Sequence, residues 1–334
     1  MNLNRRKLLA GTAATLALPA PAVWAQTKPI TFAIQYGLPY LNFIVAERQG
    51  LFTKAAEKAG VRDPKINFVR LSGPTAITEG LISGNIQVGA LGTLGLLIAH
   101  EKTRRAYDLG GLSAYWKGVY TIFANDPAIK SLKDIRPTDK IATPGPTSSQ
   151  ALILRRAAEK IFGPGEALRF DKQIVSLPHP DAVAALTTGN TVQVYFALSP
   201  FAEFLAQQPN VHVIGRTTEY NPPNMTNGVV GVLRKFVEEN KELSSAVVAA
   251  LDEAGRFIQS EVAETAKIYT AAEPSKLSAE EMLKVIENNK NEYTTEPNGI
   301  IDTANFMVKL GQLKAAPAKW QDVFFPPVNQ GSGS

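Results

Sequence analysis

Short apolar runs separated by helical segments fill the first third of the chain. The runs are rich in β-branched and aromatic residues, and the helical segments end at glycines such as Gly50, Gly60 and Gly84. The pattern predicts strands at 30–36, 66–71 and 86–91, and helices at about 40–49, 52–59, 76–83 and from 93 toward 102. Strands that alternate with helices indicate βαβ units and a parallel sheet.

The same alternation starts again in the middle of the chain. It predicts strands at 119–124, 141–143, 174–177, 192–198 and 211–214, helices at 148–162 and 181–188, and a further helix opened by Ser199-Pro200. An irregular passage at 217–227 precedes a strand at 229–233 and amphipathic helices at 246–261, 264–271, 279–288 and 303–310. Leu251, Ala254 and Ile258 repeat at helical spacing, so we expect these last helices to cover a sheet.

A weak internal repeat links the two halves. Residues 81–88 read LISGNIQV, and residues 186–194 read LTTGNTVQV. In each, a helix ends on glycine, asparagine follows, and a strand leads to Thr93 or Ser199, which starts a new helix. A chance likeness between two Gly-Asn helix stops is the alternative. The repeat favours two similar α/β lobes, which suits a chain of this length.

The first residues have the features of an export signal. A positive cluster at Arg5, Arg6 and Lys7 precedes an uncharged, Ala-rich run at 8–21 and a small-residue cleavage site ending at Ala25. We therefore predict a signal peptide over residues 1–25 and a periplasmic location. The run is shorter than the roughly 20 apolar residues of a membrane span. The paired arginines also suit the twin-arginine route, and the choice between it and the general secretory route stays open.

Composition excludes several other functions. The chain has no cysteine, which excludes disulfides, thiolate metal sites and a cysteine nucleophile. The formal charge of +5 falls to +2 once the leader's three cations are removed, and the remaining charges form no basic stripe. Nucleic acid is therefore not an expected partner. No later segment is apolar enough to cross a bilayer, and residues 331–334, GSGS, are expected to be a flexible tail.

Candidate ligand contacts follow from where the strands end. Open α/β sheets bind ligands in the crevice at the carboxyl ends of their strands. A helix that starts there offers free N–H groups to an anion, and the start at Thr147, Ser148 and Ser149 is the best candidate. Ordinary N-capping is the more common role of such residues, and it is compatible with ligand binding. Aromatic residues at loops and at the crossover could hold an apolar ligand body, or could simply pack. These aromatic residues are Tyr36, Tyr40, Trp116, Tyr120 and Phe201.

Signatures of catalysis do not occur in the sequence. The chain has no dinucleotide-binding glycine motif, phosphate-binding loop or nucleophile elbow. His100 and His212 fall inside a predicted helix and strand, and only His179, at a predicted cleft loop, suggests a hydrogen bond to ligand. No residues stand at metal-ligand spacing, so we expect no metal, cofactor or catalytic residue.

The order of several short motifs resembles the periplasmic substrate-binding proteins of ABC importers for nitrate, taurine and alkanesulfonates. These motifs are Ala46 to Phe52, Ser72-Gly73-Pro74 with Leu81 and Gly84, Ser131 to Ile135 before Lys140-Ile141-Ala142, and Asp181 to Gly189 with Ser199-Pro200. The chain departs from the family at Gln87 and Gln193, where members often carry Asp, and at Pro144 and Pro146 in the helix-start motif. The ligand could therefore be the usual sulfonate or nitrate, an aromatic carboxylate, an aryl sulfonate or a heterocyclic vitamin precursor.

The resemblance implies an α/β, two-lobed type II periplasmic-binding fold with a ligand cleft between parallel-rich lobes flanked by helices. Lobe 1 would comprise residues 26–115 and 228–330, and lobe 2 residues 116–227. By position, the family's ligand contacts fall on Gln35, Tyr36, Thr93, Thr147 to Ser149, Ser199 and Asn227.

The resemblance also implies a function. A monomer would capture a small organic anion and deliver it to the membrane permease of an ABC importer. Two alternatives stay open: an enzyme on the same fold acting on a thiamine- or menaquinone-pathway precursor, and a ligand-sensing subunit. The leader and the missing catalytic group favour the importer protein.

Overall fold

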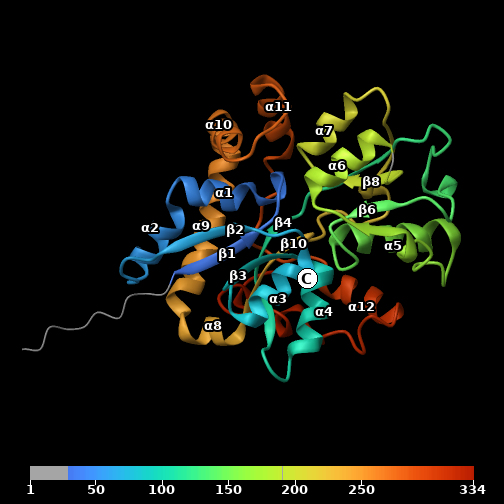
Figure 1. The fold of residues 1–334 in the computed structure, drawn as a ribbon. Coiled ribbons are helices and arrows are strands. Elements are labelled where there is room, and N and C mark those ends of the chain that lie inside the picture. The colour runs from blue at the N-terminus through green and yellow to red at the C-terminus, as the bar shows by residue number, and fades with distance from the viewer. Residues whose placement is uncertain (1–28, 190) are drawn as a thin grey trace, which may run out of the picture.

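The computed structural model describes residues 29–189 and 191–334, and the predicted signal peptide lies outside them. Two five-stranded sheets form two lobes side by side (Figure 1). The strands of lobe 1, in sheet order, are β2 (Ile66–Arg70), β1 (Ile30–Ile34), β3 (Val88–Gly92), β10 (Gly228–Leu233) and β4 (Leu109–Trp116). Those of lobe 2 are β7 (Ile174–Ser176), β6 (Ile141–Thr143), β8 (Val194–Ala197), β5 (Thr121–Ala124) and β9 (His212–Arg216).

Both sheets have the same mixed pattern. In lobe 1, β2, β1 and β3 are parallel, and β10 lies antiparallel between β3 and β4. In lobe 2, β7, β6 and β8 are parallel, and β5 lies antiparallel between β8 and β9. The chain crosses from lobe 1 to lobe 2 through residues 117–120 and returns through 217–227. The predicted α/β fold with two parallel-rich sheets is confirmed.

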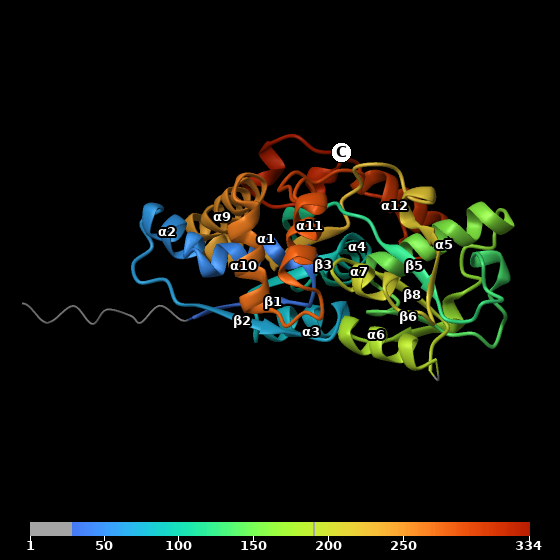
Figure 2. The same cartoon turned by 90° about the horizontal axis from the view of Figure 1, so that it is seen from above.

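Helices cover both faces of each sheet (Figures 1 and 2). The helices of lobe 1 are α1 (Leu41–Arg48), α2 (Leu51–Lys58), α3 (Pro74–Ser83), α4 (Thr93–Thr103), α8 (Arg234–Glu239), α9 (Lys241–Ser260), α10 (Val262–Ala272), α11 (Ala279–Asn289) and α12 (Ile300–Lys309). The helices of lobe 2 are α5 (Ser149–Phe162), α6 (His179–Thr188) and α7 (Phe201–Ala206). Along β1, Phe32 and Ile34 join one core and Ala33 joins another, because successive strand residues face opposite sides.

Strand β4 and helix α8 do not appear among the predicted elements. All eight residues of β4 are buried, so its sequence LGGLSAYW shows no alternation of apolar and polar positions. Its glycines are required by packing, since a Cβ at Gly111 would lie 2.4 Å from the Phe324 ring and one at Gly110 2.6 Å from the Phe325 ring. A strand that depends on distant aromatic residues has no local signal.

The C-terminal tetrapeptide also differs from its prediction as a flexible tail. The Ser334 amide donates to the Pro297 carbonyl over 3.0 Å, and the Ser334 carbonyl accepts from the Ile300 amide over 2.7 Å. A Cβ at Gly333 would lie 2.7 Å from the Trp320 ring. The last residues are therefore packed against the loop before α12.

Candidate functional site

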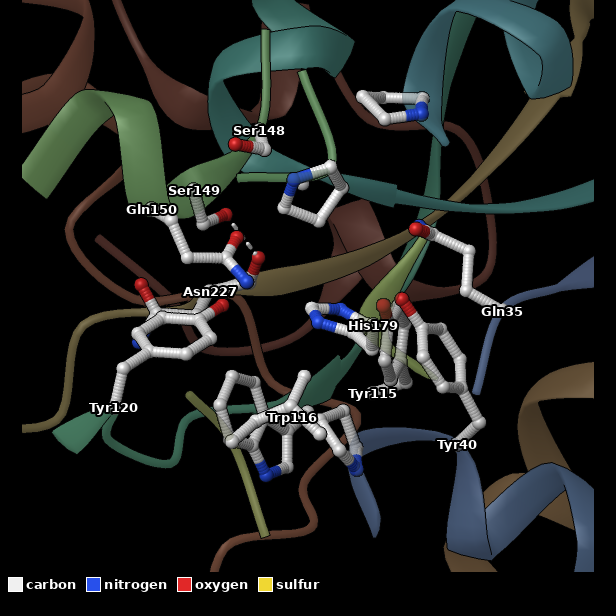
Figure 3. Close-up of a pocket in the computed structure, with 15 residues that line it drawn as sticks. Gln35, Tyr40, Tyr115, Trp116, Tyr120, Ser148, Ser149, Gln150, His179 and Asn227 are labelled. Carbon is white, nitrogen blue, oxygen red and sulfur yellow. Dashed lines mark hydrogen bonds between the residues drawn. The ribbon is translucent and has the colours of Figure 1, made fainter. Parts of the chain in front are cut away.

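A small cavity lies between the lobes where the strands of both sheets end. Gln35 follows β1, Gly92 ends β3, and Trp116 ends β4. On the other side, Ser149 starts α5 after β6, and Leu198 follows β8. The lining residues are Gln35, Pro39, Tyr40, Pro74, Gly92, Tyr115, Trp116, Tyr120, Pro144, Ser148, Ser149, Gln150, His179, Leu198 and Asn227 (Figure 3). The cavity is thus built from the carboxyl ends of strands, as the fold predicts.

The start of α5 forms the polar wall. Ser148 is the N-cap, and its Oγ accepts from the Ala151 amide over 3.2 Å and donates to the Gly145 carbonyl over 2.7 Å. The first N–H groups of a helix have no partner inside it, and the helix dipole makes this end positive. Because Ser148 caps only Ala151, the amides of Ser149 and Gln150 remain as donors on residues that line the cavity. Such a helix start is suited to an anionic group.

Ser149 joins this helix start to the crossover that leads back to lobe 1. Its Oγ donates to the Asn227 carbonyl over 2.6 Å, and the Asn227 amide group donates to the Gly118 carbonyl over 2.7 Å. A Cβ at Gly92 would lie 2.6 Å from Ser149 Oγ, so glycine at the end of β3 allows this close approach. The contact closes the lobes on each other at the cavity.

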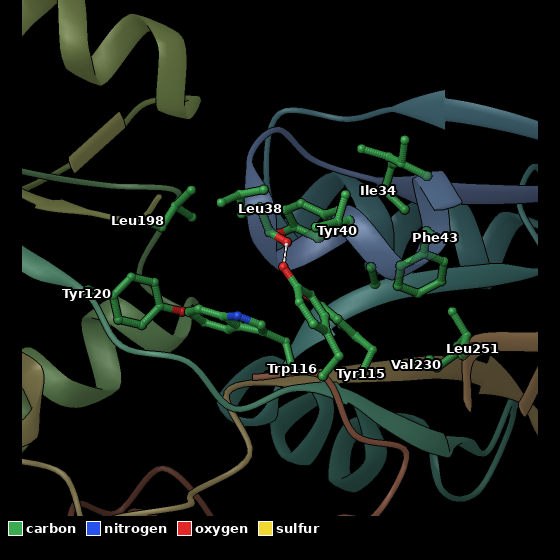
Figure 4. Close-up of a cluster of buried hydrophobic side chains, with 14 of the residues drawn as sticks. Ile34, Leu38, Tyr40, Phe43, Tyr115, Trp116, Tyr120, Leu198, Val230 and Leu251 are labelled. Atoms are coloured by element: carbon green, nitrogen blue, oxygen red, sulfur yellow. Dashed lines mark hydrogen bonds between the residues drawn. The ribbon is translucent and has the colours of Figure 1, made fainter. Parts of the chain in front are cut away.

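Aromatic rings form the opposite wall (Figure 3). The Tyr40 and Tyr115 rings lie 5.7 Å apart, and the Trp116 and Tyr120 rings meet edge to face at 5.3 Å. The same rings belong to a buried cluster that runs from lobe 1 into lobe 2 (Figure 4). Burial raises the pKa of Tyr40, Tyr115 and Tyr120 above the usual value of a tyrosine, so all three phenols are neutral near pH 7.

His179 is the only described lining residue of a type that ordinarily titrates near neutral pH, and burial keeps it uncharged. It is 2% exposed, and burial lowers its pKa to about 3. Its Nδ1 lies 2.7 Å from the Tyr195 hydroxyl, and its ring stacks on Phe201 with centroids 6.0 Å apart. Since the described lining includes no Arg, Lys, Asp or Glu, the cavity is polar but carries no side-chain charge.

Two polar side chains, Gln35 and Glu292, lie beside the aromatic wall. The side-chain Oε1 of Gln35 is buried and has no hydrogen-bond partner, which leaves an acceptor unmatched beside the cavity. Glu292 accepts from Trp116 Nε1 over 2.8 Å, and burial raises the pKa of its carboxyl to about 7. Glu292 therefore orients the Trp116 ring from behind.

The remaining space is about 20 Å³, which is room for about one water molecule. The backbone also bridges the lobes, since the Leu38 amide donates to the Ser199 carbonyl over 2.8 Å. The structure is therefore a closed arrangement in which side chains largely fill the cavity. A ligand would enter by separation of the lobes or displacement of these side chains.

The structure brings eight of the thirteen predicted contacts to the cavity: Gln35, Tyr40, Trp116, Tyr120, Ser148, Ser149, His179 and Asn227. The others lie elsewhere. Thr93 donates to the Thr226 carbonyl over 2.6 Å, and Ser199 Oγ donates to Glu203 over 2.8 Å. Thr147 precedes the N-cap, and Tyr36 and Phe201 line a separate groove.

Sequence reasoning missed the other lining residues, among them Tyr115 and Gln150. Tyr115 lies on β4, which had no local signal, although it adjoins the predicted Trp116. Gln150 follows the predicted Ser149 in the first turn of α5, and the helix start itself was the signal that could have included it.

Two α/β lobes joined by two crossovers, with a cavity at their strand ends, define the periplasmic-binding-protein fold. The chain belongs to the NMT1-like family, whose model matches residues 26–272. No curated protein matches the sequence at a significant level.

Solved structures support the fold. The alkanesulfonate-binding protein SsuA of Xanthomonas axonopodis pv. citri, bound to MOPS, is 18% identical, with a TM-score of 0.69 over 90% of this chain and 99% of that chain. The aliphatic sulphonate binding protein SsuA of Escherichia coli is 20% identical, with a TM-score of 0.64 over 87% and 90%. The nitrate-binding protein NrtA of Synechocystis PCC 6803 is 14% identical, with a TM-score of 0.68 over 90% and 86%. These neighbours are binding proteins rather than enzymes.

The part of the chain that the structure describes contains neither a membrane-spanning helix nor a cluster of metal ligands. None of the helices in residues 29–189 and 191–334 combines the length and apolar character needed to span a membrane. Within the same part of the chain, no three His, Cys, Asp or Glu side chains gather where a metal ion could be held.

Proposed function

We propose that this protein is a periplasmic solute-binding protein that captures a small organic anion, an alkyl or aryl sulfonate or carboxylate, for an ABC importer. The observation that carries the proposal is the start of α5 facing a wall of aromatic rings across an otherwise uncharged cavity. The helix start and hydroxyl groups would bind the anionic group, and the rings would contact the organic body.

The aromatic wall favours an organic anion over nitrate. Nitrate has no apolar part to place against Tyr40, Tyr115 and Trp116, whereas a sulfonate or carboxylate with an organic group does. Burying apolar ligand surface against these rings contributes binding free energy that a bare inorganic ion cannot gain. The alkanesulfonate-binding neighbour is in line with this ligand class.

Lobe closure would be the mechanism of capture. A ligand that contacts the α5 start in lobe 2 and the rings of lobe 1 binds the closed form more tightly than the open form, so it shifts the population toward closure. Delivery to a membrane permease and export by the predicted leader complete the proposed role. The neighbours named as periplasmic are consistent with this location.

A thermal-shift screen of the chain without residues 1–25 tests the proposal. The panel would hold nitrate, taurine, methanesulfonate, benzenesulfonate and benzoate. Ligand at 100 times its Kd stabilises the native state by about 2.7 kcal/mol, so a saturable rise in melting temperature is expected with an organic sulfonate or carboxylate. Gln150→Leu removes an amide side chain that lines the cavity beside the α5 start and should reduce the rise. Gln49→Leu, at the residue that follows α1, is the matched control. Absence of any shift from folded protein would contradict the proposed ligand class.

A further inference from the structure

A second, larger space lies between the lobes, outside the cavity. It measures about 430 Å³, within the range of small-molecule sites. Lobe 1 contributes Tyr36 and the end of α10, and lobe 2 contributes α6 and the start of α7. We call this space the outer groove. In Figure 1 the α10–α11 pair faces the α6–α7 pair across the lobe boundary, and Gln207 and Glu281 join them over 2.7 Å.

A thin wall separates the outer groove from the cavity. The Leu38 amide bonds to the Ser199 carbonyl in this wall, and a Cβ at Gly37 would lie 2.3 Å from Leu198. The stacked rings of His179 and Phe201 complete it, with His179 facing the cavity and Phe201 facing the groove. The two spaces are therefore adjacent but distinct in the closed arrangement.

The outer groove is apolar and walled by aromatic rings. Tyr36, Phe201, Phe204 and Tyr269 line it, together with prolines and the exposed Ala184 of α6. Flat rings in a groove of this size suit a flat, apolar ligand body.

Two charged side chains line this groove, and one of them, Lys276, has no ion-pair partner among the described residues. The carboxylate of Glu273 is paired with Arg70 at 2.8 Å and accepts from the Gly37 amide and the Tyr269 hydroxyl, each over 2.9 Å. The ammonium of Lys276 instead lies 4.8 Å from the centre of the Phe204 ring and has no carboxylate within ion-pair distance among the described residues. A cation beside an aromatic groove is complementary to an aromatic anion.

We propose that the outer groove is a second ligand site, for an aromatic carboxylate whose ring lies among the four aromatic side chains and whose carboxylate meets Lys276. Because the groove is lined from both lobes, its occupant binds the closed form preferentially. Linkage is reciprocal, so the same occupant would tighten binding in the cavity. This coupling rests on the proposed function, whereas the site itself does not.

Calorimetric titration with 2-naphthoate tests the site on the chain without residues 1–25. The wild-type protein is expected to bind it. Ala184→Trp, which fills the groove from an exposed helical position, should abolish binding, and Lys276→Glu should weaken it about fivefold or more. Lys58→Glu on α2 is the charge-matched control and should bind as the wild type does. Thermal unfolding would establish that each variant is folded.

A cavity variant separates this proposal from the proposed function. Gln150→Leu should leave 2-naphthoate binding within about twofold of wild type if the probe occupies the outer groove. Loss of binding in Gln150→Leu with retention in Ala184→Trp would place the probe in the cavity and overturn the second site. Lack of 2-naphthoate binding to the wild type would also overturn it. Taurine and methanesulfonate in the earlier screen have no aromatic ring for the outer groove, so a shift with either of them bears only on the cavity.

Discussion

The two lobes share one glutamine hydrogen bond to the backbone at the start of a central strand, and they differ in the side chains that line the cavity. In lobe 1, the Gln87 side chain accepts from the Thr31 amide at the start of β1 over 2.9 Å. In lobe 2, the Gln193 side chain accepts from the Lys140 amide just before β6, also over 2.9 Å. The internal repeat in the sequence therefore corresponds to a repeated contact that holds the first residues of a central strand.

The helices that precede these two contacts, α3 and α6, also end in the same way. Gly84 and Gly189 both end their helices in the left-handed conformation with φ of 76°. This conformation favours glycine, which explains why the repeat keeps it.

Beyond the repeat, the lobes diverge in chemistry. Lobe 1 supplies Tyr40, Tyr115 and Trp116, while lobe 2 supplies the α5 start and His179. The two lobes therefore share a strand and helix framework and differ in the residues at the ends of their strands. One wall is aromatic, and the other is a set of hydrogen-bond donors.

The largest expected loss of stability comes from substitutions in the aromatic wall. Trp116→Ala should lower the free energy of unfolding by about 3–5 kcal/mol, because it removes a buried ring and leaves Glu292 without its partner. Urea denaturation measures the loss. Trp116→Phe, which keeps a ring but loses the hydrogen bond, should cost less. Equal losses in the two variants would show that the ring does not carry the effect.

The lobe 2 wall should be sensitive to acid. Burial lowers the pKa of His179 to about 3, so the unfolded chain binds a proton at this site more readily. Its contribution to stability is present above about pH 6.5 and is lost as the pH falls toward 3, a change of a few kcal/mol. Denaturation at a series of pH values would show a flatter acid limb in His179→Gln than in the wild type. Parallel curves would contradict the assignment.

The lobe 1 wall should respond in the opposite direction. Burial raises the pKa of Glu292 to about 7, so the native state binds the proton more tightly than the unfolded chain. Stability from this group is full below about pH 4.5 and is lost as the pH rises toward 7, by about 1–3 kcal/mol. Glu292→Gln keeps an acceptor for Trp116 and should remove this component. A wild-type profile that the substitution leaves unchanged would refute it.

The smallest expected losses of stability come from the glutamine hydrogen bonds that the two lobes share. Gln87→Leu and Gln193→Leu each remove one hydrogen bond to a backbone amide, which should cost about 1 kcal/mol. Gln87→Leu also removes the bond from the Gln87 side chain to the Gly84 carbonyl, so its cost should be somewhat larger. The double variant should lose the sum, because the sites lie in different lobes. Chemical denaturation of the three variants measures this. A cost confined to one lobe would mean that the repeated contact is not equivalent in the two.

The sequence predicted the fold well because most elements carry local signals. Glycine stops, β-branched runs and helical spacing located nearly every strand and helix, and the ends of predicted strands indicated much of the cavity lining. Strand β4 had no such signal, because its burial on both faces and its glycines depend on Phe324 and Phe325 from the far end of the chain. Tyr115 was missed with it.

Tertiary contacts also decided which candidates reached the cavity. Thr93 starts a helix at a strand end as predicted, but its hydroxyl is engaged by the Thr226 carbonyl. Ser199 is held by Glu203 in the same way. Spacing along the chain cannot show that a hydroxyl has a nearer partner from a distant segment.

The central claim is that the lobes close on an organic anion at this cavity, and an interlobe distance tests it most directly. The native chain has no cysteine, so spin labels at Glu79→Cys on α3 and Thr188→Cys on α6 would report only the two lobes. Pulsed electron resonance would compare the chain without residues 1–25 alone and with whichever of benzenesulfonate or benzoate raises its melting temperature. We predict a shift to a shorter, narrower distance distribution with ligand. Identical distributions with saturating ligand would contradict capture by closure.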